Sequence, residues 1–290
     1  MTLNSKSSTL QEITSIPELG KKSKDLIQTL YSMESVLVAY SGGVDSTLLA
    51  YISSILLGDN CLAVTANSPS MGPSDLTDAT AMARSLGLNH RIINTNEFSN
   101  AEYIANGPRR CYFCKLELYS HLGPIAESEN LNFIVSGANV DDSSDFRPGM
   151  KAGQENGIRN PFIEAGICKS DIRTMSKALG LPTWDKPAQP CLSSRIPYGT
   201  PVSVEILEKV YKAESYMKNL GITECRLRHH DNIAIIEIPH EQMDIIIEAG
   251  TREELIGYIK SLGYTYVTLD IGGFKSGNLN VVLKKTNQNP

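Results

Sequence analysis

The 290-residue sequence predicts an α/β fold, in which a mostly parallel sheet carries helices on both faces and a smaller α+β domain follows. Short apolar segments alternate with helix-like segments up to about residue 137, which is the pattern of a parallel sheet. A proline-rich stretch then separates this region from a differently patterned C-terminal part. The length suits one large domain plus a smaller one, because single cores stop growing near 250–300 residues.

The first part of the chain reads as helix and strand in turn. Helices are predicted at residues 17–33, 46–57, 74–86 and 112–127, and strands at residues 35–40, 61–66, 91–94 and 133–137. Ligands of such sheets bind beyond the carboxyl ends of the strands. We therefore expect functional groups in the loops that follow these strands.

Residues 181–201 hold five prolines, which remove backbone donors and forbid regular helix. We place the domain boundary here, with residues 1–188 forming the parallel-sheet domain and residues 189–290 the α+β domain. In the second domain, helices are predicted at residues 202–220, 241–249 and 252–262, and strands at residues 224–228, 233–238 and 266–269.

The composition limits partners and location. A net charge of -5 gives no global positive field for a polyanion, so nucleic acid is not expected as a partner. No apolar run approaches the roughly 20 residues that span a bilayer, and the polar N-terminus lacks a signal-peptide core. We therefore expect a cytoplasmic protein without a membrane partner. Six cysteines are too few for a disulfide scaffold, which favours metal binding or catalysis for those that cluster.

The hexapeptide SGGVDS, at residues 41–46, lies between a predicted buried strand and a helix. Its backbone amides and the helix N-terminus converge on one small volume, which predicts an anion site. The glycines Gly42 and Gly43 permit close approach, and Ser41 and Ser46 supply hydroxyls. The lysine of the other common phosphate loop is missing. An ordinary capped turn would explain Asp45 and Ser46 but not the whole hexapeptide.

SGGVDS after VLVAY resembles the PP-loop of ATP pyrophosphatases, which bind ATP, transfer AMP to a substrate oxygen and release pyrophosphate. The resemblance implies a parallel-sheet PP-loop domain and an ATP site. The ligands that it implies are Ser41, Gly42, Gly43, Asp45, Ser46 and Asn67. Asp45 is a candidate to hold Mg²⁺ on the phosphates, because Mg²⁺ prefers oxygen ligands. Asp141 and Asp142 are further candidates, although a turn role explains them equally well.

Four further segments resemble LarE-type sulfur transferases: AVTANSPS, RRCYFCK, SGANVDDSSDFRPG and PCLSSRIPYGTP, at residues 63–70, 109–115, 136–149 and 190–201. The similarity continues through residues 226–239 to residues 269–280. It implies an enzyme that adenylates the carboxylates of pyridinium-3,5-biscarboxylic acid mononucleotide and converts them to thiocarboxylates. The product is a precursor of the nickel-pincer nucleotide cofactor. The resemblance also implies sulfide or another sulfur donor, and a homo-oligomer.

Three cysteines carry the expected sulfur chemistry. Some family members use one cysteine, at the position of Cys191, and surrender its sulfur in a single turnover. This sequence adds Cys111 and Cys114, which share one side of a helix start. Three thiolates can hold three corners of a 4Fe-4S cluster and leave one iron open to sulfide. A zinc site with His229 or His230, a disulfide between Cys111 and Cys114, and inert thiols are the alternatives. Single buried thiols are expected at Cys61, Cys168 and Cys225.

Arginines suit an anionic substrate because guanidinium binds phosphate and carboxylate in bidentate pairs. Arg226 and Arg228 alternate on one predicted strand and so face the same side. With Arg195 they resemble the basic substrate pocket of the family. A solvated strand face is the alternative. Two acidic residues resemble carboxylates near that pocket, Glu214 and Glu237. Lys275 departs from the arginine that the family often has there.

Two other functions fit part of the sequence. PP-loop enzymes that thiolate tRNA also use three cysteines and a cluster, but the acidic composition and the lack of a basic extension oppose this hypothesis. A nucleotide sensor without catalysis would bind ATP and leave the cysteines and arginines without a role.

Overall fold

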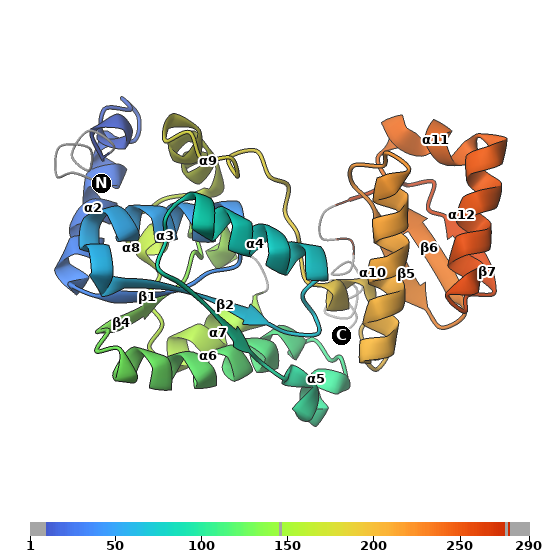
Figure 1. Cartoon of the computed structure of the whole chain (residues 1–290), viewed down its shortest axis with the longest axis horizontal. Helices are drawn as coiled ribbons and strands as arrows, with labels where there is room; N and C mark the ends of the chain where they lie inside the picture. Colours follow the sequence, from blue (N-terminus) through green and yellow to red (C-terminus); the bar gives the residue numbers. More distant parts are fainter. Residues whose placement is uncertain (1–9, 145–146, 276–277, 279–290) are drawn as a thin grey trace, which may run out of the picture. The chain divides into compact units, whose positions relative to one another are not determined.

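The computed structural model describes residues 10–144, 147–275 and 278 (Figure 1). The chain divides into two compact units. The first comprises Met1–Glu97 and Cys111–Gln189, and the second comprises Phe98–Arg110 and Pro190–Pro290. The second unit thus includes a stretch between residues 98 and 110 that the predicted boundary near residue 188 assigns to the first domain.

A parallel sheet of four strands in the order β3-β2-β1-β4 forms the centre of the described part of the first unit. The strands are β1 Val36–Ala39, β2 Cys61–Asn67, β3 His90–Asn94 and β4 Phe133–Val135. Val38 pairs with Ala63 on one side and with Val135 on the other. The predicted parallel sheet is therefore confirmed, and the functional loops follow its strands at one edge.

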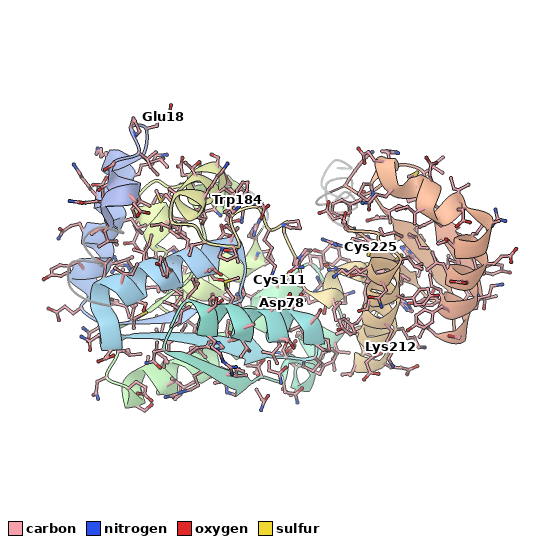
Figure 2. All side chains as sticks on the ribbon, turned by 45° about the horizontal axis from the view of Figure 1, so that its top comes forward. Glu18, Asp78, Cys111, Trp184, Lys212 and Cys225 are labelled. Carbon is pink, nitrogen blue, oxygen red and sulfur yellow. The ribbon has the colours of Figure 1, made fainter. Side chains whose placement is uncertain are left out.

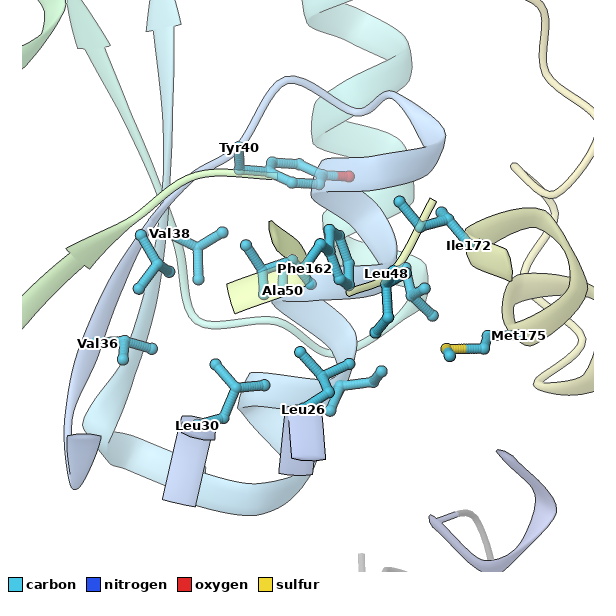
Figure 3. Packing of buried hydrophobic residues seen from close by; sticks show 14 of the residues in the cluster. Leu26, Leu30, Val36, Val38, Tyr40, Leu48, Ala50, Phe162, Ile172 and Met175 are labelled. Carbon is cyan, nitrogen blue, oxygen red and sulfur yellow. The ribbon is translucent and has the colours of Figure 1, made fainter. Parts of the chain in front are cut away.

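Helices cover both faces of this sheet, because alternate residues of the central strand point to opposite sides. Val36 and Val38 join a buried cluster with Leu30 and Leu48 from one layer of helices (Figure 3). Leu37 joins the opposite cluster. The first layer contains α2 Gly20–Met33, α3 Val44–Leu57, α4 Pro73–Ser85, α8 Pro161–Glu164 and α9 Lys169–Ala178, and the second contains α6 Arg110–Ser128 and α7 Pro148–Glu155.

Helix α9 was not among the predicted elements, yet its local sequence explains it. Cys168 and Asp171 form a reciprocal capping box at its start. Ile172 and Met175 lie three residues apart and are buried against the core, which is the spacing of an amphipathic helix. The short helices α7 and α8 begin with Pro148 and Pro161, where proline is well tolerated.

The second unit contains a sheet in the order β5-β6-β7, with β5 and β6 antiparallel and β6 and β7 parallel. The stacked rings of Tyr216 and Tyr258, 4.1 Å apart, join two of its helices. Its elements are α5 Ala101–Ile104, α10 Val204–Asn219, β5 Arg226–His230, β6 Ile233–Glu237, α11 Met243–Ile247, α12 Ala249–Ser261 and β7 Tyr266–Leu269. The 3-10 helices of the two units are η1 Gly58–Asn60, η2 Glu97–Ser99, η3 Val140–Ser144, η4 Leu192–Arg195 and η5 His240–Gln242.

No helix within the described ranges is long and apolar enough to cross a membrane.

Candidate active site

The loop between β1 and α3 has the geometry of an anion cradle. Gly42 adopts a left-handed backbone with φ of 71°, and a Cβ there would lie 2.7 Å from the Cβ of Ala79 on α4. Position 42 therefore requires glycine for two reasons: the left-handed backbone and the close approach of α4. Gly43 is the N-cap of α3 and has no side chain with which to cap the first turn. The helix N-terminus thus offers its amides and its positive dipole end to an anion.

The two serines of the loop bind each other. The backbone N–H of Ser41 donates to Ser46 Oγ at 3.1 Å, and the two hydroxyl oxygens are also 3.1 Å apart. Ser46 Oγ donates to the Gly43 carbonyl at 3.3 Å. Hydrogen bonds of the two serine hydroxyls therefore stabilise the conformation of the loop.

Asp45 is the residue of this loop best suited to bind a cation. Its Oδ2 accepts a hydrogen bond from Lys169 Nζ at 2.6 Å, whereas its buried Oδ1 has no hydrogen-bond partner among the described residues. Burial raises the pKa of Asp45, and the ion pair with Lys169 opposes that rise. A buried carboxylate oxygen without a partner costs free energy unless a ligand satisfies it. The donor type and position fit Mg²⁺ held together with nucleotide phosphates.

Asp141 and Asp142 are engaged in the turn after β4. Asp141 Oδ2 accepts the backbone N–H of Lys169 at 2.8 Å. Asp142 accepts the N–H of Asn139 at 3.0 Å and pairs with Arg147 at 2.9 Å. These contacts are those of turn and helix-capping residues.

Lys169 is a site residue that the sequence did not reveal. It is the first residue of α9, and it binds Asp45 through its ammonium group. The capping pattern of Cys168 and Asp171 could have placed a helix start there, and a lysine at such a start is unusual because it faces the positive end of the dipole. An anion at the adjacent loop would compensate that charge.

Asn67 ends β2 at the edge where ligands of parallel sheets bind. Its Nδ2 donates to Asn94 Oδ1 at 2.9 Å, and the two residues are register partners on β2 and β3. The amide of Asn67 is therefore held in one orientation.

The six cysteines differ in their exposure to solvent. Cys111 and Cys114 occupy the first turn of α6, and Cys191 is the N-cap of η4 (Figure 2 labels Cys111). Cys111 and Cys191 are exposed, and Cys114 is half-buried. Cys61 and Cys225 are buried as expected, and burial raises the pKa of each thiol to about 12. The expectation of a buried thiol is wrong for Cys168, which is half-buried because it lies at the N-terminus of α9, where its Sγ is 3.1 Å from Ser170 Oγ.

Across residues 10–144, 147–275 and 278, no group of three or more His, Cys, Asp or Glu side chains is placed to hold a metal ion. Cys111 and Cys114 belong to the first unit, and Cys191 belongs to the second. A cluster shared by the three thiols therefore stays a prediction. His229, one of the two histidines of the zinc alternative, is buried, and its Nδ1 lies 3.0 Å from the hydroxyl of Tyr264. The zinc alternative also stays a prediction.

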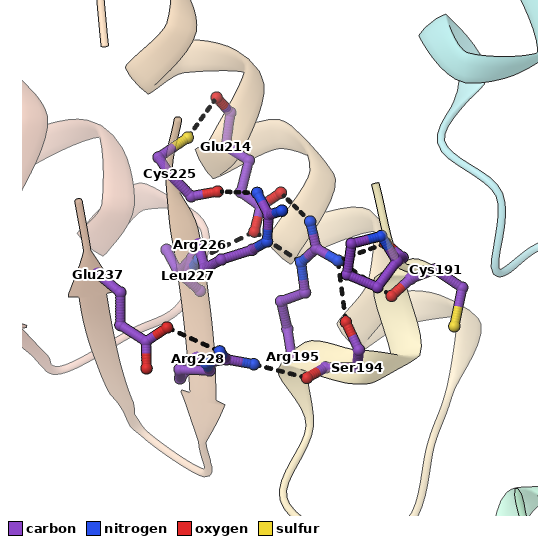
Figure 4. Close-up of polar contacts among 10 residues, drawn as sticks. Cys191, Ser194, Arg195, Glu214, Cys225, Arg226, Leu227, Arg228 and Glu237 are labelled. Carbon is purple, nitrogen blue, oxygen red and sulfur yellow. Dashed lines mark hydrogen bonds and ion pairs between the residues drawn. The ribbon is translucent and has the colours of Figure 1, made fainter. Parts of the chain in front are cut away.

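The predicted substrate arginines lie in one network of the second unit (Figure 4). Arg195 forms a two-point ion pair with Glu214, and both side chains are buried. Arg228 donates to Glu237 Oε2 and to the Ser194 carbonyl, each at 2.7 Å. The predicted substrate roles of these residues stay predictions.

Arg226 lies 4.9 Å from the centroid of the Phe274 ring. Burial, and then the neighbouring charge of Arg195, lower the pKa of Arg226. An anion beside this guanidinium would relieve both unfavourable effects.

Known proteins are similar in sequence to this protein over nearly the whole chain. A family model described as NAD synthase matches residues 18–106, which include the PP-loop. A pyridinium-3,5-bisthiocarboxylic acid mononucleotide synthase of Lactiplantibacillus plantarum is 37% identical over 268 residues, which cover 92% of this chain and 96% of that protein. The chain belongs to the LarE family.

Two uncharacterised proteins are also similar to this LarE-family chain. One from Synechocystis sp. is 46% identical over 92% of this chain and 100% of its own length. One from Methanocaldococcus jannaschii is 30% identical over 88% of this chain and 96% of its own length. The predicted enzyme class is confirmed: the chain is an ATP-utilising sulfur transferase built on a PP-loop domain.

Proposed function

We propose that this LarE-family enzyme adenylates the carboxylates of pyridinium-3,5-biscarboxylic acid mononucleotide and converts them to thiocarboxylates for nickel-pincer cofactor synthesis. The observation that carries the proposal is the 37% identity with the bisthiocarboxylic acid mononucleotide synthase over 92% of this chain. The ATP site would lie at the PP-loop, and the substrate site at the arginine strand of the second unit.

The proposed reaction has two steps, adenylation and sulfur transfer. A substrate carboxylate oxygen attacks the α-phosphorus of ATP, forming an acyl adenylate and expelling pyrophosphate. A sulfide sulfur then attacks the activated carbonyl, forming a carbon–sulfur bond and expelling AMP. The amides at the α3 N-terminus, Ser41 and Ser46 would bind the leaving pyrophosphate, and Asp45 would hold Mg²⁺ on it.

On the substrate side, Arg226 and Arg228 would bind the phosphate or a carboxylate of the mononucleotide. Both arise from β5 and point to the same side of the strand. Glu237, which accepts from Arg228, would orient that guanidinium. A charge-assisted contact of this kind contributes about 1.5–3 kcal/mol.

For the sulfur source, Cys111, Cys114 and Cys191 would hold a 4Fe-4S cluster. When bound, this group would supply an iron on which the transferable sulfide is carried. The exposure of Cys111 and Cys191 suits thiolate ligands. Arg110, directly before Cys111 in the chain, donates to the carbonyl of Ser193, two residues beyond Cys191, at 2.8 Å.

An anaerobic assay with ATP, Mg²⁺, sulfide and the biscarboxylic mononucleotide tests the proposal. We expect AMP and pyrophosphate, and a substrate mass that changes by oxygen-for-sulfur exchange. ADP and orthophosphate as main products would contradict the PP-loop chemistry. A parallel assay with bulk tRNA separates the other thiolation: sulfur in tRNA, with none in the mononucleotide, would move the substrate to nucleic acid.

A sacrificial Cys191 is the second candidate, supported by the exposure of its thiol on a loop. In this mechanism Cys191 loses its sulfur to the substrate and becomes dehydroalanine. Intact-protein mass after one turnover decides between the two. Loss of one hydrogen sulfide, independent of iron, would support the sacrificial route, whereas unchanged mass over several turnovers would support the cluster.

A further inference from the structure

The loop that carries Cys191 rests on a buried ion pair. Arg195 Nε donates to Glu214 Oε1 and Arg195 Nη2 donates to Glu214 Oε2, both at 2.9 Å. Each residue is only 4% exposed. Two parallel N–H···O bonds of this kind fix the orientation of a guanidinium as well as its position. Arg195 is thereby anchored to helix α10.

The remaining nitrogen of the same guanidinium, Nη1, donates to the backbone around Cys191. Arg195 Nη1 donates to the carbonyl of Pro190 at 2.6 Å and to the carbonyl of Cys191 at 3.0 Å. These carbonyls belong to the peptide groups immediately before and after Cys191. A third acceptor, Ser194 Oγ, lies 3.0 Å away (Figure 4). The backbone is held on both sides of Cys191 while its thiol remains exposed.

Glu214 is fixed in turn by the sheet. Its Oε1 also accepts the backbone N–H of Leu227 on β5 at 3.0 Å. The carboxylate therefore connects α10, β5 and, through Arg195, the Cys191 loop. Because both charges are buried and paired with each other, an anionic substrate would have to displace the Glu214 carboxylate in order to bind Arg195.

We infer that Arg195 is a positioning residue that fixes the backbone of Cys191 for sulfur transfer, and that Glu214 is its buried counter-ion rather than a substrate ligand. The sulfur-transfer part of this inference rests on the proposed function. Positioning requires a rigid support, because a displacement of about 1 Å can lower a rate about 10²-fold. The planar fork of arginine supplies such a support, and the single ammonium of lysine does not.

Two variants separate positioning from loss of the fold. Arg195→Lys keeps the charge opposite Glu214 but cannot reach both carboxylate oxygens and both carbonyls. The double variant Arg195→Met with Glu214→Gln removes both buried charges, so neither is left without a counter-ion. The side-chain carbonyl of the introduced glutamine can still accept from Leu227 N–H. The carbonyls of Pro190 and Cys191 both lose the guanidinium donor, although the Cys191 carbonyl still accepts the backbone N–H of Ser194 at 3.0 Å. Arg226→Lys serves as the matched control for a substrate contact.

We expect kcat for thiolation to fall about 10²-fold in both variants, with KM for the mononucleotide within about twofold of the wild type. Hydrogen exchange in the peptide that covers residues 190–196 should rise in both. Arg226→Lys should instead raise KM and leave exchange in that peptide unchanged.

Other results would overturn the inference. A rise in KM with kcat retained in Arg195→Lys would make Arg195 a substrate ligand. Unchanged exchange in residues 190–196 of the double variant would show that the loop does not depend on the pair. If the wild type does not thiolate the mononucleotide, the proposed function fails by itself. The exchange of residues 190–196 and the rate of Cys191 alkylation then decide whether Arg195 positions this cysteine.

Discussion

At the scale of single residues, Asp45 shows how a site is built at the expense of stability. Its buried Oδ1 has no partner among the described residues, and burial raises its pKa despite the ion pair with Lys169. A raised carboxyl pKa means that the ionised form is less favourable in the folded protein than in the unfolded chain. The carboxylate therefore destabilises the protein without ligands and becomes favourable once a cation is bound.

Asp45→Asn should accordingly have opposite effects on activity and stability. We expect pyrophosphate release to fall about 10²-fold, because an amide binds Mg²⁺ far more weakly than a carboxylate. Without Mg²⁺ and ATP, the melting temperature should be unchanged or higher, since the ionised buried carboxylate is gone. Asp59→Asn, at an exposed position of η1, is the control for both measurements. Full activity in Asp45→Asn would remove the magnesium role.

The two glycines of the PP-loop should respond differently to alanine. Gly42→Ala places a side chain on a left-handed backbone and against Ala79, so we expect a loss of about 2–4 kcal/mol of unfolding free energy. Gly43 has φ of -80°, and its added Cβ would meet only Ser41 Oγ, at 3.5 Å. Gly43→Ala should cost less than about 1 kcal/mol. Urea denaturation measures both; equal losses would contradict the assigned geometry.

The exposed and the buried thiols should differ in their reactivity toward an alkylating reagent. Because burial raises the pKa of Cys61 and Cys225 to about 12, both thiols stay protonated at pH 8. Iodoacetamide should therefore modify the exposed Cys111 and Cys191 in the native protein, and Cys61 and Cys225 only after denaturation. Peptide mass spectrometry measures the order. Early labelling of Cys225 would mean that the core of the second unit opens readily.

At the scale of elements, the segment between residues 98 and 110 clamps the Cys191 loop from a second direction. Asn106 is fully buried in a left-handed conformation, with φ of 52°. Its Nδ2 donates to the carbonyls of Pro197 and Thr200, each at 2.8 Å. Tyr103 places its hydroxyl 2.6 Å from Ser193 Oγ. The proline-rich stretch is thus held by side-chain donors together with two backbone hydrogen bonds, from Gly199 N–H to the Asn106 carbonyl and from Val202 N–H to the Ile104 carbonyl.

Asn106→Ala should destabilise the second unit by about 3 kcal/mol, because buried carbonyls lose their donor and alanine disfavours the left-handed backbone. Asn106→Gly keeps that backbone without strain, so it should lose about 1 kcal/mol less. Thermal unfolding of the two variants separates the amide contribution from the backbone contribution. Equal stability of Asn106→Gly and the wild type would show that the amide contributes nothing.

At the scale of the whole molecule, the three thiols of the proposed cluster come from both units. Anaerobic reconstitution should therefore give about four irons per chain, and alanine at Cys111, Cys114 or Cys191 should abolish iron binding. Cys168→Ala is the control and should leave iron binding unchanged, because Cys168 lies at the N-cap of α9 and is not one of the proposed ligands. An iron chelator should stop multiple turnovers without unfolding either unit, as each contains its own sheet. Iron retained in all three variants would contradict the cluster.

The sequence was most informative where local pattern and tertiary structure agree. β1, α3 and β2 follow the predicted ranges within one or two residues, because the apolar pattern of a buried strand or of a helix is carried by its local sequence. The sequence pattern predicts no helix or strand between residues 138 and 180. Its helices are short, and α7 and α8 begin at prolines that the chain presents as turn signals.

By itself, the sequence determined the α/β class, the PP-loop, the family and the residue types available for chemistry, because these depend on periodicity and on short contiguous motifs. Only the tertiary structure decided that Lys169 meets Asp45 across 124 positions, that Arg195 pairs with Glu214, and that residues 98–110 join the second unit. The physical reason is that pairing of buried charges is settled by which elements pack together. Such packing minimises unpaired polar groups over the whole fold and leaves no signature in the local sequence.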